Sequence, residues 1–189
     1  MVMISLLMDA GAFKVLTLFG LSPGSRFNRK EIKEKTLLNN MPLDAALKNA
    51  LASGVLKKSG NHYSLNTGDE KTMSLMSLVS SQYKSMKNLP LSVYFLLSEL
   101  AGVAALERGV EIYLFGSYSK LVYSDKSDVD VAILTTKFTG KEGLRAAARK
   151  LGSKYGKAVE LHFFEKHSFH KNHKDPLVKE ILKNGTRLT

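Results

Sequence analysis

Two short apolar segments, one ending in glycine and serine and the other beginning with two acids, constrain the fold of this chain most. The first, VEIYLF, stops at Gly116-Ser117, and the second starts ten residues later as Asp128-Val129-Asp130 and continues as VAIL. Both are rich in the β-branched and aromatic residues that favour strands. The sequence therefore predicts a strand that ends in a tight turn, a loop, and a second strand that begins with acidic residues.

The second of these strands presents two carboxylates on one side. Successive side chains of an extended chain point to opposite faces, so Asp128 and Asp130 project together while Val129 and Val131 face the core. Carboxylates held this closely repel one another, unless a cation lies between them or one of them takes up a proton. Mg²⁺ is the cation we expect, because it prefers oxygen ligands and combines a few carboxylates with substrate phosphates.

A third acid and a phosphate-binding turn complete the candidate site. Glu160 is the one acidic residue of AVELHFF, a strand-like segment that follows an amphipathic helical pattern near residues 140–154. Gly116 allows the backbone to approach a ligand closely, and Ser117 presents a hydroxyl and unpaired N–H groups at the start of a helical turn. We therefore expect this turn to hold a triphosphate.

The motifs occur in the order IYLFGS, YSKLVYSDKS, DVDVAIL and VELHF, and the chain ends in KDPLVKEILKNGTRL. Residues 110–189 thus resemble the polymerase-beta-type nucleotidyltransferases, specifically their minimal archaeal and bacterial members. The resemblance implies an α/β (α+β) domain over residues 109–189, with a mixed sheet and flanking helices. It also implies transfer of a nucleoside monophosphate from a nucleoside triphosphate such as ATP, with release of pyrophosphate.

The resemblance implies a role for each residue of the motif. Asp128 and Asp130 would hold two Mg²⁺ ions. Glu160 would bind the ion nearest the acceptor and help to deprotonate the acceptor hydroxyl. Ser117 and Lys120 would hold the phosphates.

The chain departs from the family pattern at three positions. Lys120 and Leu121 stand where an arginine and a glycine are usual. Lysine binds a phosphate as a point charge and lacks the bidentate fork of arginine, and loss of the glycine stiffens the loop. Glu160 stands where an aspartate is more usual, so its longer arm either shifts the metal site or serves as the base.

The first 66 residues show helical patterns followed by a hairpin. An apolar opening helix is followed by the turn-rich stretch SPGSRFN and then by a second helix, RKEIKEKTLL, which Asn28 and Glu31 are expected to cap. A third helix, NNMPLDAALKNALASG, ends at Gly54, and VLKK and HYSLN then flank a hairpin turn. This order resembles a winged helix-turn-helix domain over residues 10–66.

We therefore expect three parts: a winged-helix domain at 1–66, connecting helices at 67–108 and the nucleotidyltransferase domain at 109–189. The winged-helix resemblance implies DNA binding, although the third helix offers few side chains that read base edges. The candidate DNA-binding residues are Lys30, Lys33, Lys48, Lys57 and Lys58.

Composition limits the partners and the compartment. The net charge of +11 favours partners that carry phosphate, such as nucleic acid or nucleoside triphosphates. The chain has no cysteine, which excludes disulfides, thiol nucleophiles and cysteine-ligated zinc. The opening segment is interrupted by Asp9 and Lys14 and lacks the pattern of a signal peptide. We expect a cytoplasmic protein without a membrane partner.

Several alternatives stay open. The acceptor is a protein, a nucleic acid or a small molecule, and a homodimer is compatible with the sequence. Two other functions are alternatives to nucleotidyl transfer. The chain is then a DNA-binding transcriptional regulator whose second domain senses a nucleotide, or an interaction protein whose active site has decayed. His167, His170 and His173, beside His162, have a spacing that suggests zinc, but they lie in a lysine-rich polar segment that favours a solvated surface.

Overall fold

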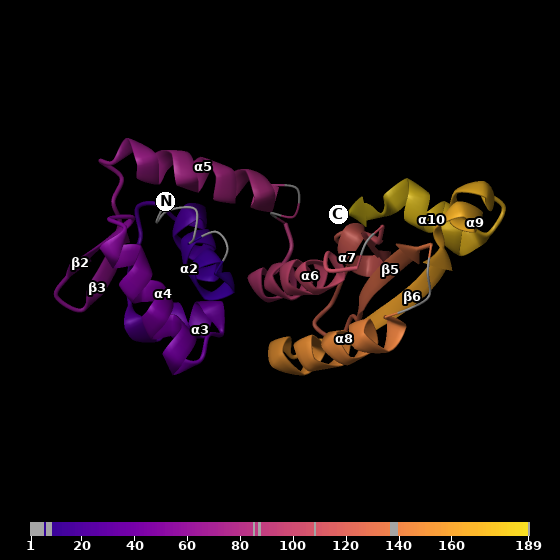
Figure 1. Ribbon diagram of the computed structural model, residues 1–189, viewed down its shortest axis with the longest axis horizontal. Helices are drawn as coiled ribbons and strands as arrows, with labels where there is room; N and C mark the ends of the chain where they lie inside the picture. The colour runs from indigo at the N-terminus through magenta and orange to yellow at the C-terminus, as the bar shows by residue number, and fades with distance from the viewer. Residues whose placement is uncertain are drawn as a thin grey trace. The chain divides into compact units, whose positions relative to one another are not determined.

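A computed structural model describes residues 6, 9–84, 86, 88–107, 109–136 and 140–188, and it divides into two compact units, Met1–Lys87 and Asn88–Thr189 (Figure 1). The segment that we expected to connect the domains is shared between them. Helix α5 (Glu70–Lys84) belongs to the first unit and helix α6 (Leu91–Ala104) to the second.

The first unit combines helices with a small antiparallel sheet whose strand order is β1-β3-β2. Besides α5, its elements are α2 (Ala10–Leu21), β1 (Arg26–Asn28), α3 (Arg29–Thr36), α4 (Asn40–Ala52), β2 (Leu56–Ser59) and β3 (His62–Leu65). The expected opening helix falls partly on residues 1–5, 7 and 8, which lie outside the described residues. From Asp9 onward it is present, and the Asp9 side chain caps α2 by accepting a hydrogen bond from the Ala12 N–H.

The start of α3 follows the expected capping box, but the segment before it differs from our prediction. Asn28 Oδ1 accepts from the Glu31 N–H at 3.0 Å, and Glu31 Oε2 accepts from the Asn28 N–H at 2.7 Å. We expected SPGSRFN to be a turn-rich stretch, whereas its last three residues, Arg26–Asn28, form strand β1 and pair with β3. Three residues are too few for a periodic signal, and their partner strand lies far along the chain.

The second unit contains the expected mixed sheet, with strand order β6-β5-β4-β7. Strand β4 is antiparallel to β5 and β7, whereas β5 and β6 are parallel. The strands are β4 (Glu111–Phe115), β5 (Val129–Thr135), β6 (Val159–Glu165) and β7 (Thr186–Arg187). The helices, besides α6, are α7 (Gly116–Ser119), α8 (Lys141–Tyr155), α9 (Lys166–Lys171) and α10 (Pro176–Asn184).

Helices cover both faces of this sheet (Figure 1). On one face α8 packs against β6 and α6 packs against α8, and the Tyr155 hydroxyl of α8 donates to Glu99 of α6 at 2.6 Å. On the other face α9 and α10 supply Phe169, Val178 and Ile181 to a buried apolar cluster. Within the described residues, no helix has the length and apolar character needed to cross a membrane.

Candidate functional site

The centre of the candidate site is a pair of carboxylates on neighbouring parallel strands. Asp130 of β5 and Glu160 of β6 are register partners, so both side chains emerge on the same face of the sheet. Two residues further along β6, His162 emerges on that face as well. The potential ligand atoms of Asp130, Glu160 and His162 all lie within 4.8 Å of one another.

Gly116 packs directly against the Asp130 carboxylate. It follows Phe115, the register partner of Asp130 on β4, and its φ of 71° lies in the left-handed region. A Cβ atom on residue 116 would stand 2.9 Å from Cγ of Asp130 and still closer to Oδ2. Only glycine combines this backbone conformation with room for the carboxylate.

Asp128 lies immediately before β5 and is exposed, whereas Asp130 is half-buried. Val129 and Val131 are fully buried, so the aspartates alternate with core residues as the sequence predicted. Burial raises the pKa of Asp130 above its usual value, and the charge of Glu160 adds to the increase. Asp128 raises this pKa further and His162 opposes the increase. A divalent cation would offset the repulsion between Asp130 and the two neighbouring carboxylates.

The phosphate-binding residues that we predicted lie on and after the Gly116 turn. Ser117 is half-buried in the short helix α7. Lys120 caps the end of α7, and its ammonium group forms an ion pair with Glu180 of α10. That contact lowers the pKa of Glu180. A bound phosphate would therefore compete with Glu180 for the Lys120 side chain.

His162 is the residue of this site that sequence reasoning missed. We grouped it with the histidines of the polar segment, but the strand places it beside Glu160, with Nε2 3.3 Å from Oε1. Its ring meets the edge of Phe115, with the centroids 5.2 Å apart. The Glu160-x-His162 spacing, which puts both side chains on one face of a strand, is the signal that identifies it.

The donor set fits a divalent cation. Two carboxylates and an imidazole offer ligand atoms that lie within 4.8 Å of one another, and the absence of a side chain at Gly116 leaves room for the Asp130 carboxylate. Among the described residues, His167, His170 and His173 form no comparable group. The zinc interpretation of those histidines therefore has no support in the geometry.

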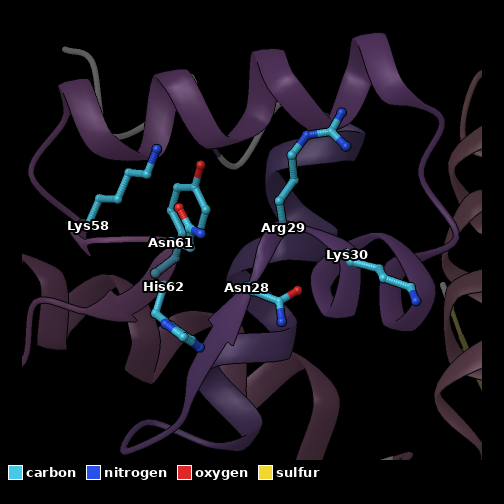
Figure 2. A pocket seen from close by; sticks show the side chains of 7 residues that line it. Asn28, Arg29, Lys30, Lys58, Asn61 and His62 are labelled. Atoms are coloured by element: carbon cyan, nitrogen blue, oxygen red, sulfur yellow. The ribbon is translucent and has the colours of Figure 1, made fainter.

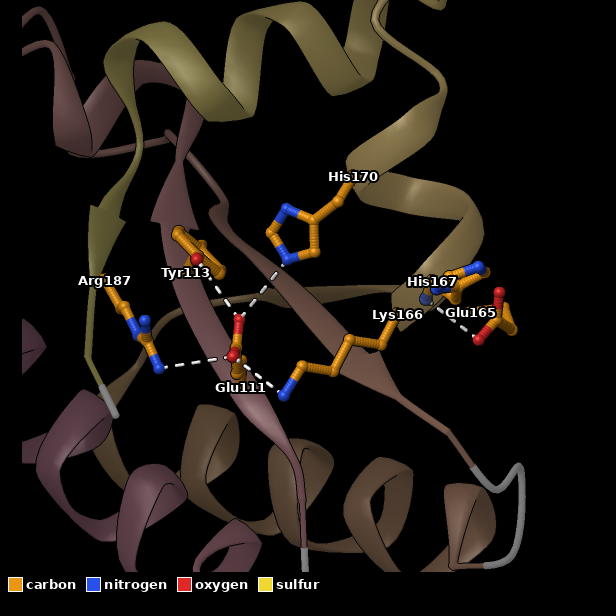
Figure 3. A network of polar contacts seen from close by, with 7 residues as sticks. All are labelled: Glu111, Tyr113, Glu165, Lys166, His167, His170 and Arg187. Atoms are coloured by element: carbon orange, nitrogen blue, oxygen red, sulfur yellow. Dashed lines mark hydrogen bonds and ion pairs between the residues drawn. The ribbon is translucent and has the colours of Figure 1, made fainter.

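At the opposite end of the same sheet face, several basic side chains surround the carboxylate of Glu111 (Figure 3). Lys166 Nζ lies 2.9 Å and Arg187 Nη2 3.3 Å from Glu111 Oε1, while His170 Nε2 lies 3.8 Å from Oε2. The hydrogen bond from Lys166 holds the pKa of Glu111 below its usual value. Glu111 is four residues before Phe115, so this network lies about 13 Å along the strand from the carboxylate pair. It joins β4 to β7 and α9.

The first unit carries a separate basic hollow of about 460 Å³ (Figure 2). Its lining residues are Asn28, Arg29, Lys30, Lys58, Asn61, His62 and Tyr63. Two of the five predicted DNA-binding lysines, Lys30 and Lys58, belong to it, and Figure 2 shows them on opposite sides. Arg29 contributes less free charge, because its guanidinium binds both carboxylate oxygens of Asp44 at 2.7 and 2.9 Å. The other three lysines lie outside the hollow.

Comparison with known families supports the interpretation of the second unit. Residues 99–188 match the family model described as nucleotidyltransferase domain, and this match includes the Gly116 turn, both aspartates and Glu160. No match was found among curated proteins or among solved structures. The family match therefore supports nucleotidyl transfer in general and does not specify the acceptor.

Proposed function

We propose that the second unit transfers a nucleoside monophosphate from a nucleoside triphosphate to an acceptor hydroxyl. The acceptor oxygen attacks the α-phosphorus, the bond between this phosphorus and the bridging oxygen of the β-phosphate breaks, and pyrophosphate leaves. The observation that carries the proposal is the Asp130–Glu160 register pair, which lies directly on the Gly116 turn within a matched nucleotidyltransferase domain.

Each residue has a role that its position supports. Asp130, half-buried between two strands, and Asp128, exposed beside it, would hold divalent ions, with Mg²⁺ the ion that their oxygen atoms favour. Such ions stabilise the attacking and leaving oxygens of an in-line displacement. Glu160 would share with Asp130 the ion nearest the acceptor. Its side chain is 60% exposed, so an acceptor hydroxyl has access to it, and it accepts the hydroxyl proton. Ser117 and the backbone of α7 bind the phosphates, and Lys120 adds a positive charge when it leaves Glu180.

The direct test is to incubate the purified chain with each labelled nucleoside triphosphate and Mg²⁺ in host lysate, and to identify whatever gains label. Labelling of one acceptor species by wild-type protein, and not by the Asp130→Asn variant, supports the proposal. Thermal stability with ATP and Mg²⁺ gives an independent check, because a ligand that binds only the folded state raises the melting temperature. Absence of both labelling and stabilisation would reject the proposal.

A second function is favoured by the basic hollow. We propose that the first unit is a winged-helix domain that binds the phosphate backbone of DNA through α3 and the β2–β3 hairpin. The support is the order of its helices and hairpin, together with Lys30, Lys58 and His62 around one concave surface. In a chain with both functions, the first unit brings the transferase to DNA. In a regulator, the second unit only senses a nucleotide, and measured turnover separates these two cases.

A further inference from the structure

His162 lies where it adds a nitrogen atom to an otherwise oxygen-lined site. Strand β6 fixes it on the face that carries Glu160, and the edge contact with Phe115 holds its ring there. The His162 side chain is 28% exposed and that of Glu160 is 60% exposed, so the imidazole lies deeper in the site than the carboxylate. An imidazole that is partly withdrawn from solvent beside two carboxylates is placed to contact an ion that they share.

We propose that His162 supplies an imidazole ligand to the ion held by Asp130 and Glu160, and that this site therefore selects a first-row transition ion such as Mn²⁺ or Co²⁺ over Mg²⁺. The inference rests on the proposed function of these two carboxylates. It changes the identity of the ion next to the acceptor, for which the carboxylates alone favour Mg²⁺.

The spacing of the three side chains is compatible with a shared ion. Ligands about 2.1 Å from a metal lie about 3 Å apart when they are neighbours and about 4 Å apart when they are opposite. The three potential ligand atoms already lie within 4.8 Å of one another, so small side-chain rotations bring them to these distances. No movement of the strands is needed.

The choice of ion follows from the chemistry of the donors. Mg²⁺ prefers an all-oxygen shell with near-ideal octahedral geometry, whereas imidazole suits the later first-row ions. A set of two carboxylates and one imidazole still accepts Mg²⁺, because water and phosphate oxygens complete the shell. The imidazole raises the affinity for Mn²⁺ more than that for Mg²⁺. It raises the affinity for Co²⁺ further still, because affinity for divalent first-row ions increases from Mn²⁺ to Co²⁺.

The inference is tested by direct ion binding to the full chain without nucleotide. Co²⁺ is titrated by its visible absorption bands, which respond to nitrogen ligands, Mn²⁺ by electron paramagnetic resonance, and Mg²⁺ by competition against Mn²⁺. We expect wild-type protein to bind Co²⁺ and Mn²⁺ at least about 10-fold more tightly than Mg²⁺. His162→Ala should lose about 10- to 100-fold in Co²⁺ affinity, while Mg²⁺ affinity changes by less than about 3-fold.

Two further variants serve as controls. His170→Ala removes the same side chain from the other end of the same sheet face, where it contacts Glu111, and should bind all three ions as wild-type protein does. His162→Asn keeps a polar side chain that offers an oxygen atom, so it should bind Mg²⁺ normally and still lose the preference for Co²⁺. Circular dichroism of each variant confirms that it is folded.

The outcomes separate this inference from the proposed function. Equal affinity of wild-type protein for all three ions, or unchanged Co²⁺ binding by both His162 variants, would overturn the inference. If Asp130→Asn still weakens Mg²⁺ binding in that case, the carboxylate site and the proposed function stand. If Asp130→Asn changes the affinity of none of the ions, the proposed metal site itself is wrong.

Discussion

Gly116 and Asp130 are packed so closely that a Cβ on residue 116 would lie 2.9 Å from Cγ of Asp130. The glycine thus determines where the carboxylate lies, in addition to forming the turn after β4. The strand register produces this contact, because Phe115 pairs with Asp130 and Gly116 is the next residue. The turn proposed to bind phosphate and the carboxylate proposed to bind metal are therefore one structural unit.

Gly116→Ala should displace the Asp130 carboxylate and abolish transfer. The left-handed backbone alone costs about 1–2 kcal/mol with a Cβ present, and the contact with Asp130 adds to this. Gly109 has a similar φ of 77°, and a Cβ added there would meet nothing within 4 Å, so Gly109→Ala is a matched control for the backbone term. Urea unfolding should show the larger loss for Gly116→Ala. Equal losses in the two variants would show that the Asp130 contact has no effect.

Asp128→Asn and Asp130→Asn should each abolish turnover while the fold stays intact, because each removes a ligand of the proposed ions. Asp130→Asn should also raise the melting temperature of the metal-free protein. The folded-state pKa of Asp130 is raised, so its ionisation destabilises the fold as the pH rises above the unfolded-state value of about 3.9. The stabilising effect of the substitution should appear at neutral pH and vanish below about pH 3. Near-normal turnover of either variant would contradict the metal assignment.

The sequence alone predicted the parts of this site that depend on local periodicity. The alternation of Asp128, Val129 and Asp130 has the period of a strand, and the buried valine between two polar side chains agrees with it. The mixed sheet was also expected, from the resemblance to a known family. The strand periodicity is a local signal, because the segment that contains Asp128 and Asp130 carries all the information that it requires.

The missed features depend on pairings between distant segments. His162 joins the site because β6 pairs in parallel with β5, and the ion pair of Lys120 with Glu180 depends on where α10 packs. Strand β1 forms because β3, more than thirty residues later, offers it an edge to pair with. The Glu160-x-His162 spacing placed the two side chains on one face of a strand, but only the pairing of β6 with β5 brings that face to Asp130.

Glu160→Gln should separate catalysis from nucleotide binding, because the acceptor hydroxyl loses its base while the Gly116 turn and Asp130 remain. Turnover should fall by about 100-fold or more, and ATP affinity should change little. The alternative is a purely structural ion pair, whose partner here is His162 at 3.3 Å. In that case the melting temperature would fall and the rate would be spared, so both are measured on one sample.

Lys58→Ala should weaken DNA binding by the first unit and flatten its dependence on salt. Each lost phosphate contact lowers the slope of log affinity against log salt concentration by about 0.9, because fewer counterions are released. Lys30→Ala, on the other side of the hollow, should have the same effect. Lys71→Ala removes the same charge from α5, outside the hollow, and should leave the slope unchanged. Identical slopes for all three variants would reject the hollow as the DNA-binding surface.

Leu121→Gly should stabilise the second unit. Leu121 stands where the resembled family usually has glycine, and its φ of 59° lies in the left-handed region, which costs a residue with a Cβ about 1–2 kcal/mol. Glycine loses about 0.5–1 kcal/mol through its more flexible unfolded chain. Leu121 is 49% exposed, so removal of its side chain sacrifices little burial.

The net effect of Leu121→Gly should be a gain of a few tenths to about 1 kcal/mol, measured as slower amide exchange in the second unit. Leu37 is a matched control in the first unit, because it ends α3 with a φ of 54° and is 42% exposed. Leu37→Gly should stabilise the first unit by a similar amount and leave exchange in the second unit unchanged. Faster exchange in Leu121→Gly, with the expected gain in Leu37→Gly, would show that Leu121 makes contacts worth more than its backbone strain. The loop would then need its leucine, and the departure from the family pattern would be a feature of this protein's own site.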